Sequence, residues 1–318
     1  MDSSAWGGSE ELWSRTALEF AAQGIPVSAN VHRWAPPHLR MVELIERGVE
    51  VQFRPIPYPL WKRGWLAFAA PQKTPLVAEV QRHIDAIKPQ LAVISEGTGP
   101  FPPVELLDLC VIRQLPFAWI QHVNMDSFWV PDEYAERYRK TLAAAQRCYF
   151  VSKATHRLTE KQIGCDLPNA EVVWNPVNVD FNAAPAWPRS APEGELRFAC
   201  VARLAPSHKG QDILFEALAG PLWAARPWRL SLYGEGPMRH TLERLVRHLG
   251  LSDRVVFAGH VSSVEEIWGS NHVLVMPSRF EGLPLAMIEA MLCGRPVIAT
   301  DVAGHSEMIE DGVTGFLA

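Results

Sequence analysis

Cysteine is scarce in this 318-residue sequence, and the five that occur are dispersed as Cys110, Cys148, Cys165, Cys200 and Cys293. No two of them form a C-x-x-C pair. An odd and dispersed set argues against a disulfide framework and against a cysteine-based zinc site. We therefore expect reduced and chemically inert thiols, most of them buried.

Long apolar runs are missing as well, since none reaches the roughly 18 residues that a membrane-spanning helix needs. The opening residues, MDSSAWGGSEELW, lack the basic and apolar regions of a secretory signal peptide. These two absences predict a cytoplasmic protein.

An excess of positive charge is also absent, because 30 Lys and Arg face 35 Asp and Glu, for a net charge of −5. A general nucleic-acid-binding protein is usually basic, so no nucleic-acid partner is expected. With 48% hydrophobic and 20% charged residues, the chain is not intrinsically disordered. Any anion site must therefore be built from a few well-placed cations.

The sequence contains a regular alternation of strand-like and helix-like segments. Apolar runs such as 196–202 alternate with amphipathic runs such as 238–249. The alternation predicts, in each half of the chain, a parallel sheet with helices on both faces. A Pro- and Ala-rich stretch without an apolar period, 182–194, interrupts the pattern. We predict an α/β protein with two tandem Rossmann-like domains, 1–181 and 195–318, joined by a linker at 182–194.

Two cations follow the first strand of the second predicted domain, in the segment VARLAPSHKGQD. Arg203 and Lys209 stand between that strand and the next helix. In open α/β sheets, ligands bind at the carboxyl ends of strands, and cations beside a helix N-terminus suit a diphosphate. From the spacing alone, a surface loop with two solvated cations is the alternative interpretation.

A second segment, MPSRFEGLPLAMIEAMLCGRPVIATD, carries two acidic residues separated by seven others. Glu281 is expected in the loop after a strand, and Glu289 in the helix that follows. Gly282 lets a ligand approach the backbone, and Pro284 suits a first helical turn. Amides at the start of this helix are donors for an anion, and a carboxylate accepts hydrogen bonds from sugar hydroxyls. Taken alone, the two acids are also compatible with a capped helix bearing solvated carboxylates.

This second segment resembles the donor-binding signature of glycosyltransferase family 4, whose members are retaining enzymes of the GT-B fold. Other stretches are similar to the family too, and they cover most of the chain. In the second half these are YGEGPMRHTLERLVRHLGLSDRVVFAGHV and ATDVAGHSEMIEDGVTGFLA, and in the first half WGGSEELW, FVSKATHRL and WNPVNVDFN. The resemblance implies two Rossmann-like domains with a cleft between them.

The resemblance implies a role for each matching position. Arg203 and Lys209 would hold the donor diphosphate. Glu281 would contact the hydroxyls of the donor sugar, and Glu289 the ribose hydroxyls. His122, in WIQHVN, would reach the sugar and phosphates from the first domain, although a histidine there is also compatible with a plain core residue. The remaining donor-binding positions are glycines and backbone donors: Gly7, Gly8, Gly259, His260, Val261, Gly282, Leu283 and Leu285.

The implied activity is transfer of a sugar from a nucleotide-diphosphate sugar to an acceptor hydroxyl, with retention at the anomeric carbon. The acceptor would be a glycan, a lipid-linked molecule or a small molecule, as in polysaccharide or glycolipid synthesis. No D-x-D triplet occurs, and such a triplet usually holds a divalent cation in the other main transferase fold. We expect neither a metal nor a cofactor, with the diphosphate neutralised by Arg203, Lys209 and a helix dipole.

Two other interpretations remain open at this point. The chain is also compatible with another enzyme of the same fold, such as a nucleotide-sugar epimerase or a glycosyl phosphorylase. It is compatible, too, with a non-catalytic subunit that binds a nucleotide-sugar. The sequence does not indicate the donor base, the donor sugar or the acceptor.

The segment 61–73, WKRGWLAFAAPQK, mixes cations with aromatic residues. Peripheral membrane contact would involve Trp61, Lys62, Arg63, Trp65 and Phe68. The same composition is also compatible with two other interpretations. The segment could form a wall of the acceptor pocket, or it could be a loop that packs on its own domain.

Both ends of the chain look short beside the family. Only Met1–Trp6 precede the Gly-Gly loop, where a first strand is usual, and the sequence stops at GFLA, where further helices are usual. We expect a marginally stable first domain with two unpaired strand edges, and low transfer activity from these 318 residues.

Overall fold

The computed structural model describes residues 6–32, 38–54, 75–97, 99–188, 194–261, 263–302 and 304–318. The chain falls into two compact units. Unit 1 comprises residues within 1–122, 126–151 and 156–173, and unit 2 comprises 123–125, 152–155 and 174–318. The predicted membrane-contact residues, Trp61 to Phe68, lie outside the described residues.

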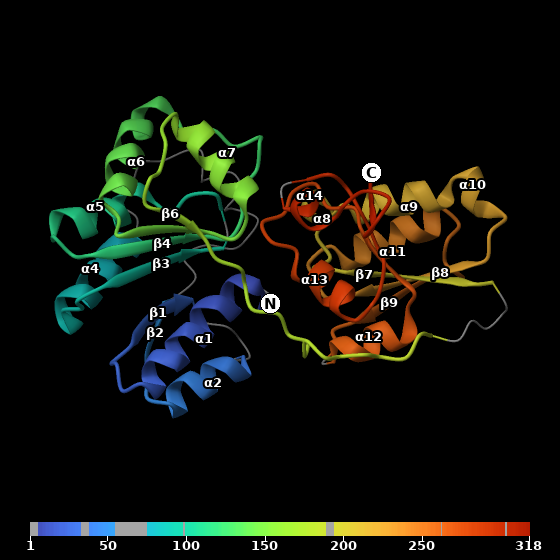
Figure 1. The fold of residues 1–318 in the computed structure, drawn as a ribbon, viewed down its shortest axis with the longest axis horizontal. Coiled ribbons are helices and arrows are strands. Elements are labelled where there is room, and N and C mark those ends of the chain that lie inside the picture. Colours follow the sequence, from blue (N-terminus) through green and yellow to red (C-terminus); the bar gives the residue numbers. More distant parts are fainter. Residues whose placement is uncertain are drawn as a thin grey trace. The chain divides into compact units, whose positions relative to one another are not determined.

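Unit 1 alternates helices with strands, as the sequence predicts (Figure 1). Its elements are α1 (Gly8–Ala22), β1 (Ser28–His32), α2 (Leu39–Glu46), β2 (Glu50–Arg54), α4 (Pro75–Ile87), β3 (Ala92–Glu96), α5 (Val104–Ile112), β4 (Phe117–Gln121), α6 (Asp132–Ala144), β5 (Arg147–Phe150), α7 (Lys153–Ile163) and β6 (Ala170–Val172). Helix α5 is absent from the sequence prediction. Its sequence, VELLDLCVI, is apolar even on its exposed side, at Val111 and Ile112, and so shows no helical period.

The alternation suggests one sheet for this half, but the described strands form two parallel sheets, β1-β2 and β3-β4-β5-β6. Each sheet has its own core. Ala17, Met41 and Leu44 of α1 and α2 pack with the first sheet. Trp119 and Phe150 belong to a separate core with the second sheet. Among the described strands, β1, β2, β3 and β6 are all edge strands.

Unit 2 is a single doubly wound sheet (Figure 1). Its elements are β7 (Leu196–Val201), α8 (Pro206–Lys209), α9 (Gln211–Ala219), α10 (Pro221–Ala224), β8 (Trp228–Tyr233), α11 (Arg239–His248), β9 (Val255–Gly259), α12 (Val264–Ser270), β10 (Val273–Met276), α13 (Leu285–Leu292), β11 (Val297–Ala299), α14 (His305–Met308) and β12 (Phe316–Leu317). The strand order is β12-β11-β10-β7-β8-β9. The short elements α8, α10, α14 and β12 are too brief for a periodic pattern and are absent from the prediction.

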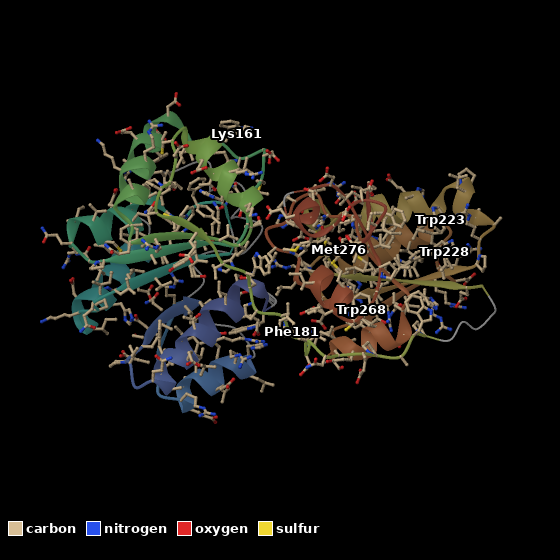
Figure 2. The ribbon with its side chains drawn as sticks, in the orientation of Figure 1. Lys161, Phe181, Trp223, Trp228, Trp268 and Met276 are labelled. Atoms are coloured by element: carbon tan, nitrogen blue, oxygen red, sulfur yellow. The ribbon has the colours of Figure 1, made fainter. Side chains whose placement is uncertain are left out.

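Both faces of the unit 2 sheet are covered, and each face has its own apolar core. One core contains Phe215 of α9 with Trp228 of β8, and the other contains Trp268 of α12 with Met287 of α13. Figure 2 shows Trp228 and Trp268 on opposite sides of the β7–β8 ribbon. Burial on both faces explains why β10 (VLVM) and β11 (VIA) are apolar runs, whereas β8 (WRLSLY) keeps an alternating pattern.

The beginning of the predicted linker packs on unit 2. Arg295 is buried and donates to the carbonyls of Pro185 and Ala186, at 3.0 and 2.8 Å. Its guanidinium also lies 4.9 Å from the ring centre of Trp187. His272 Nε2 lies 3.1 Å from the carbonyl oxygen of Pro188. These contacts hold residues 185–188 against the strand and helix ends of unit 2.

The cysteines behave as the sequence predicts. All five are free thiols, and all except Cys165 are buried. Burial raises the pKa of Cys110 to about 11 and that of Cys200 to about 12, so neither is a reactive thiolate at neutral pH. Within the described ranges, no helix is long and apolar enough to cross a membrane.

Gly210 fixes how α8 and α9 pack on the end of β10. Its φ of +62° is left-handed, and an added Cβ would lie 1.8 Å from the carbonyl oxygen of Pro277. Gly250 has a similar φ, +71°, but nothing lies within 4 Å of its Cβ position. Replacing either glycine therefore forces another residue into a left-handed backbone conformation. Only at Gly210 does the new side chain also collide with a neighbouring atom.

We expect Gly210→Ala to destabilise the protein by roughly 2–3 kcal/mol more than Gly250→Ala, because only the first adds a backbone collision to the cost of a left-handed alanine. The measurement is the midpoint of thermal unfolding of the whole chain, compared among the two variants and the wild type. Equal losses would show that the close approach of Gly210 to β10 contributes nothing.

Candidate donor-binding site

Unit 2 places three polar loops at one edge of its sheet. Strands β7, β10 and β11 are neighbours and run parallel, so their carboxyl ends lie at the same edge. The loop after β7 leads to Arg203 and Lys209. The loop after β10 carries Ser278 and Glu281, and Thr300 directly follows β11. Strand direction alone therefore gathers the candidate residues of this unit.

The predicted diphosphate cation and the predicted sugar-binding carboxylate are in direct contact. Glu281 is 6% exposed, and its Oε1 accepts a hydrogen bond from Lys209 Nζ at 2.6 Å. Ser278 Oγ donates to the same oxygen at 2.7 Å. Thr300 Oγ1 in turn donates to the Ser278 carbonyl at 2.5 Å, which fixes the loop. The sequence predicts the two charged residues but not their ion pair.

The electrostatics of the site follow from this pair. Burial raises the pKa of Glu281, but the charge and hydrogen bond of Lys209 and the hydrogen bond of Ser278 outweigh burial, so the pKa lies below its ordinary value. The pKa of His208 is lowered by burial first and then by the charges of Arg203 and Lys209. At neutral pH the site therefore has an ionised carboxylate and two cations, with His208 uncharged.

Arg203 is the more accessible of the two cations. Its backbone is fixed, because the carbonyl accepts a hydrogen bond from Gln211 Nε2 at 2.8 Å. Its side chain is exposed and forms no ion pair within the described parts of the chain. The guanidinium is thus free to bind an anion at the sheet edge.

Backbone donors lie where the sequence predicts them. Helix α13 begins at Leu285, directly after Pro284, and no side chain caps it. Within the first turn, the amide of Met287 donates to the Pro284 carbonyl at 3.0 Å, and the amides of Leu285 and Ala286 have no backbone acceptor among the described residues, as at any helix start. Gly282 and Leu283 are buried in the loop between Glu281 and this turn. A phosphate or hydroxyl oxygen at the site can therefore accept from this backbone.

The predicted base-binding residues also end a strand at the same edge. Strand β9 ends at Gly259, whose carbonyl accepts from the amide of Gly234 at 2.8 Å. His260 is exposed, and Val261 is partly buried against the core of α12 and α13. Two strands separate β9 from β10 in the sheet, namely β7 and β8.

Glu289 makes a structural contact that the sequence does not predict. It is buried in α13, and its Oε1 accepts a hydrogen bond from the backbone amide of Asn178 at 3.0 Å. Asn178 belongs to the segment before the predicted linker. Glu289 therefore supports that segment in addition to its predicted role at the ribose.

His122, Gly7 and Gly8 belong to unit 1. His122 follows β4, is 7% exposed, and has Nε2 2.9 Å from Ser95 Oγ of β3. Gly7 caps the 15-residue α1, and its amide donates to the Glu10 side chain at 3.0 Å. Ser9, which follows Gly8, abuts Gly97 directly after β3. The histidine and the glycine loop therefore meet at the carboxyl edge of the β3–β4 sheet.

His305 is a site residue that the sequence analysis misses. It is fully buried at the start of α14, and its Nδ1 lies 2.6 Å from the Thr300 carbonyl oxygen, so Nδ1 carries the proton. Its Nε2 is buried without a hydrogen-bond partner in the described residues. The charges of Glu281 and Lys209 act on the pKa of His305 in opposite directions, Glu281 raising it and Lys209 lowering it. The one sequence feature that could indicate His305 is its position after a strand. Many other polar residues also follow strands, so this feature does not single it out.

No group of three or more His, Cys, Asp or Glu side chains with the arrangement of a metal site occurs in the parts of the chain that the structure describes. The charged groups at the site are the cations and carboxylates given above.

Comparison with known proteins finds similarity in the last part of the chain, residues 195–318. Residues 195–318 match the model of the family described as "Glycosyl transferases group 1". An α-D-kanosaminyltransferase of Streptomyces kanamyceticus is 36% identical over 119 residues, which are 37% of this chain and 31% of that protein. The putative glycosyltransferase EpsD of Bacillus subtilis is 41% identical over 110 residues, 35% of this chain and 29% of that protein. The chain thus matches less than a third of the length of these relatives.

Solved structures show the fold of the whole chain. The Anabaena protein HepE in complex with UDP covers 99% of this chain with a TM-score of 0.71 and 20% identity, over 83% of HepE. A glycosyltransferase of Rickettsia africae covers 99% with a TM-score of 0.72 and 16% identity, over 81% of that protein. At these identities the likeness concerns the fold alone, which is GT-B.

The buried histidine makes stability depend on pH. Burial is the main cause that lowers the pKa of His305 below its unfolded value of 6.5, and the charge of Lys209 adds to it, while Thr300, Glu281 and Asp301 act in the opposite direction. The unfolded chain then binds the proton more readily, so stability is full above pH 6.5 and is lost as pH falls below it. The pKa of Glu281 is lowered from 4.5, so the stability that this carboxylate contributes to the fold is lost only at lower pH.

We therefore expect the thermal unfolding midpoint of the wild type to decrease as the pH is lowered from about 7.5 to about 5.5. The variant His305→Asn should show a smaller slope of this midpoint against pH. One proton accounts for at most about 1.4 kcal/mol per pH unit. His208→Asn should act in the same direction. A wild-type slope in His305→Asn would contradict this assignment.

Proposed function

We propose that this chain, in which residues 195–318 form a group 1 glycosyltransferase domain and which has the GT-B fold, transfers a sugar from a nucleotide-diphosphate sugar to an acceptor hydroxyl. The observation that carries the proposal is one edge of the unit 2 sheet. There, Lys209 pairs with the carboxylate of Glu281, and Arg203 and the first turn of α13 follow strands that end at the same edge. Two cations and free amides suit a diphosphate, and a buried carboxylate suits sugar hydroxyls.

Each residue has a role in this proposal. Arg203 and Lys209 hold the diphosphate, and the amides of Gly282, Leu283 and Leu285 support the phosphate and sugar. Glu281 accepts hydrogen bonds from the sugar. The ribose is bound by Glu289, and the base by the backbone of 259–261. His122, Gly7 and Gly8 contribute from unit 1.

We propose a retaining reaction in which the leaving diphosphate takes the acceptor proton. The resemblance to glycosyltransferase family 4 suggests this front-face course. The glycosidic bond to the diphosphate breaks, and the acceptor oxygen bonds to the anomeric carbon on the same face. Catalysis then consists of stabilising the leaving diphosphate and positioning both substrates, without a metal.

The acceptor and the cellular context are extensions of the same proposal. The relatives above and others, such as a lipopolysaccharide core mannosyltransferase of Rhizobium meliloti, are named for sugar transfer, which supports a glycan or lipid-linked acceptor. A cytoplasmic location, with peripheral membrane contact through the segment 61–73, fits such an acceptor.

A product assay tests the function. The whole chain is incubated with UDP-, GDP- and ADP-sugars and a panel of hydroxyl acceptors, with and without EDTA. We expect a glycosylated acceptor of retained anomeric configuration, formed at the same rate with EDTA. If the protein binds the nucleotide-sugar but neither transfers the sugar nor hydrolyses the donor, it is a non-catalytic subunit. Conversion of the donor without an acceptor would indicate an epimerase.

Removing either cation should weaken nucleotide-diphosphate binding by about ten- to a hundredfold, because a charge-assisted contact contributes roughly 1.5–3 kcal/mol. Calorimetric titration of Arg203→Ala and Lys209→Ala with the nucleotide diphosphate measures the loss. Arg229→Ala, at an exposed arginine of β8, is the matched control and should bind normally. Unchanged affinity in both site variants would refute their role.

A further inference from the structure

The contact between Lys209 and Glu281 does more than place two donor-binding side chains next to each other. Both groups are needed by the donor in the function proposed above, and each is occupied by the other. Oε1 of Glu281 already accepts from Lys209 Nζ and from Ser278 Oγ, which fills its two lone pairs. Oε2 accepts from no donor among the described residues. The ion pair therefore neutralises the charge of each partner, while Oε2 and two of the three N–H groups of Nζ keep hydrogen-bonding capacity among the described residues.

We propose that donor binding is an ion-pair exchange: the diphosphate takes Lys209 from Glu281, and a hydroxyl of the donor sugar takes the place of the ammonium at Oε1. This inference rests on the proposed function and deepens it, since it says how the same site responds to the two parts of its donor.

Charge favours the exchange. A diphosphate bound to Nζ while Nζ stays 2.6 Å from Oε1 would bring its negative oxygens within a few ångströms of a buried carboxylate. Like charges that close repel strongly where little water screens them. Movement of Nζ toward the phosphate relieves the repulsion. Lys209 is free to make this movement because its side chain is 25% exposed.

The carboxylate stays in place when the ammonium leaves. Ser278 is buried and keeps its hydrogen bond to Oε1, and Thr300 holds the Ser278 carbonyl. Glu281 then lacks one donor and its counter-charge. A buried acceptor without a donor is costly, so a sugar hydroxyl that restores the hydrogen bond is favoured. The exchange therefore makes binding of the intact donor stronger than binding of the bare nucleotide.

The other ionisable groups around Glu281 do not substitute for Lys209. His208 on α8 and His305 on α14 have pKa values lowered mainly by burial, so both are neutral at pH 7.5. Cys200 on β7 has its pKa raised to about 12 by burial and is also neutral. The competition for Glu281 at this pH is therefore between the Lys209 ammonium and the donor sugar, and Arg203 remains a second cation for the diphosphate.

The test is calorimetry on the whole chain at about pH 7.5. Probes are UDP with UDP-glucose, GDP with GDP-mannose, and ADP with ADP-glucose, and the pair that raises the unfolding midpoint is used. Glu281→Gln keeps the side-chain shape but releases Lys209. We expect it to bind the bare nucleotide about tenfold more tightly than wild type and to lose the preference for the nucleotide-sugar. In a Lys209→Met background, Glu281→Gln should change the affinity less than about twofold.

A matched control removes another carboxylate that pairs with a cation in the same unit. Asp212 accepts from Arg279 at 2.7 Å, and Asp212→Asn should leave both affinities unchanged. Two results would overturn the exchange: weaker nucleotide binding by Glu281→Gln, as expected if Lys209 bridges both groups, or equal tightening without Lys209, as expected from a simple loss of negative charge. No binding of any probe by wild type would instead contradict the proposed function.

If Glu281→Gln does not fold, the wild-type protein still decides the matter. A crystal structure with the nucleotide-sugar should show Nζ bound to a phosphate oxygen, more than 4 Å from Oε1, with a sugar hydroxyl at Oε1. An unbroken contact between Nζ and Oε1 in that complex would refute the exchange.

Discussion

The parallel pairing of β7 with β8 on one side and β10 on the other is the constraint on which the donor site depends. Parallel strands need crossover helices, and these helices return the chain to the same starting edge each time. Every loop that follows a strand therefore opens at the opposite edge. The cations after β7, the carboxylate after β10 and Thr300 after β11 are far apart in sequence, and they meet there because of strand direction.

Within that frame, the buried charge of Glu281 sets the local chemistry. A carboxylate that is 6% exposed stays ionised only because Lys209 and Ser278 hold it, so cation and carboxylate depend on each other. Such a pair is costly to break by mutation. In the proposed exchange, a diphosphate linked to a sugar opens the pair by supplying a new partner to each member.

The sequence predicts much of this, because its strongest signals are periodic or positional. The long helices and apolar strands of unit 2 have clear patterns, and Arg203, Lys209 and Glu281 are found after strands as expected. Helix α5 has no polar face and so no periodic signal. The split of unit 1 into two sheets depends on pairing between distant strands, which no local pattern encodes. The Lys209–Glu281 contact and the burial of His305 depend on side-chain packing across loops, and spacing along the chain does not reveal either.

Hydrogen exchange of the whole chain, with and without a nucleotide-sugar, tests most directly that the carboxyl edge of the unit 2 sheet binds the donor. The account predicts slower exchange at the amides of Gly282, Leu283 and Leu285 and in the loop from Arg203 to Lys209 when the ligand is present. Slower exchange elsewhere in unit 2, with these amides unchanged under saturating ligand, would contradict it.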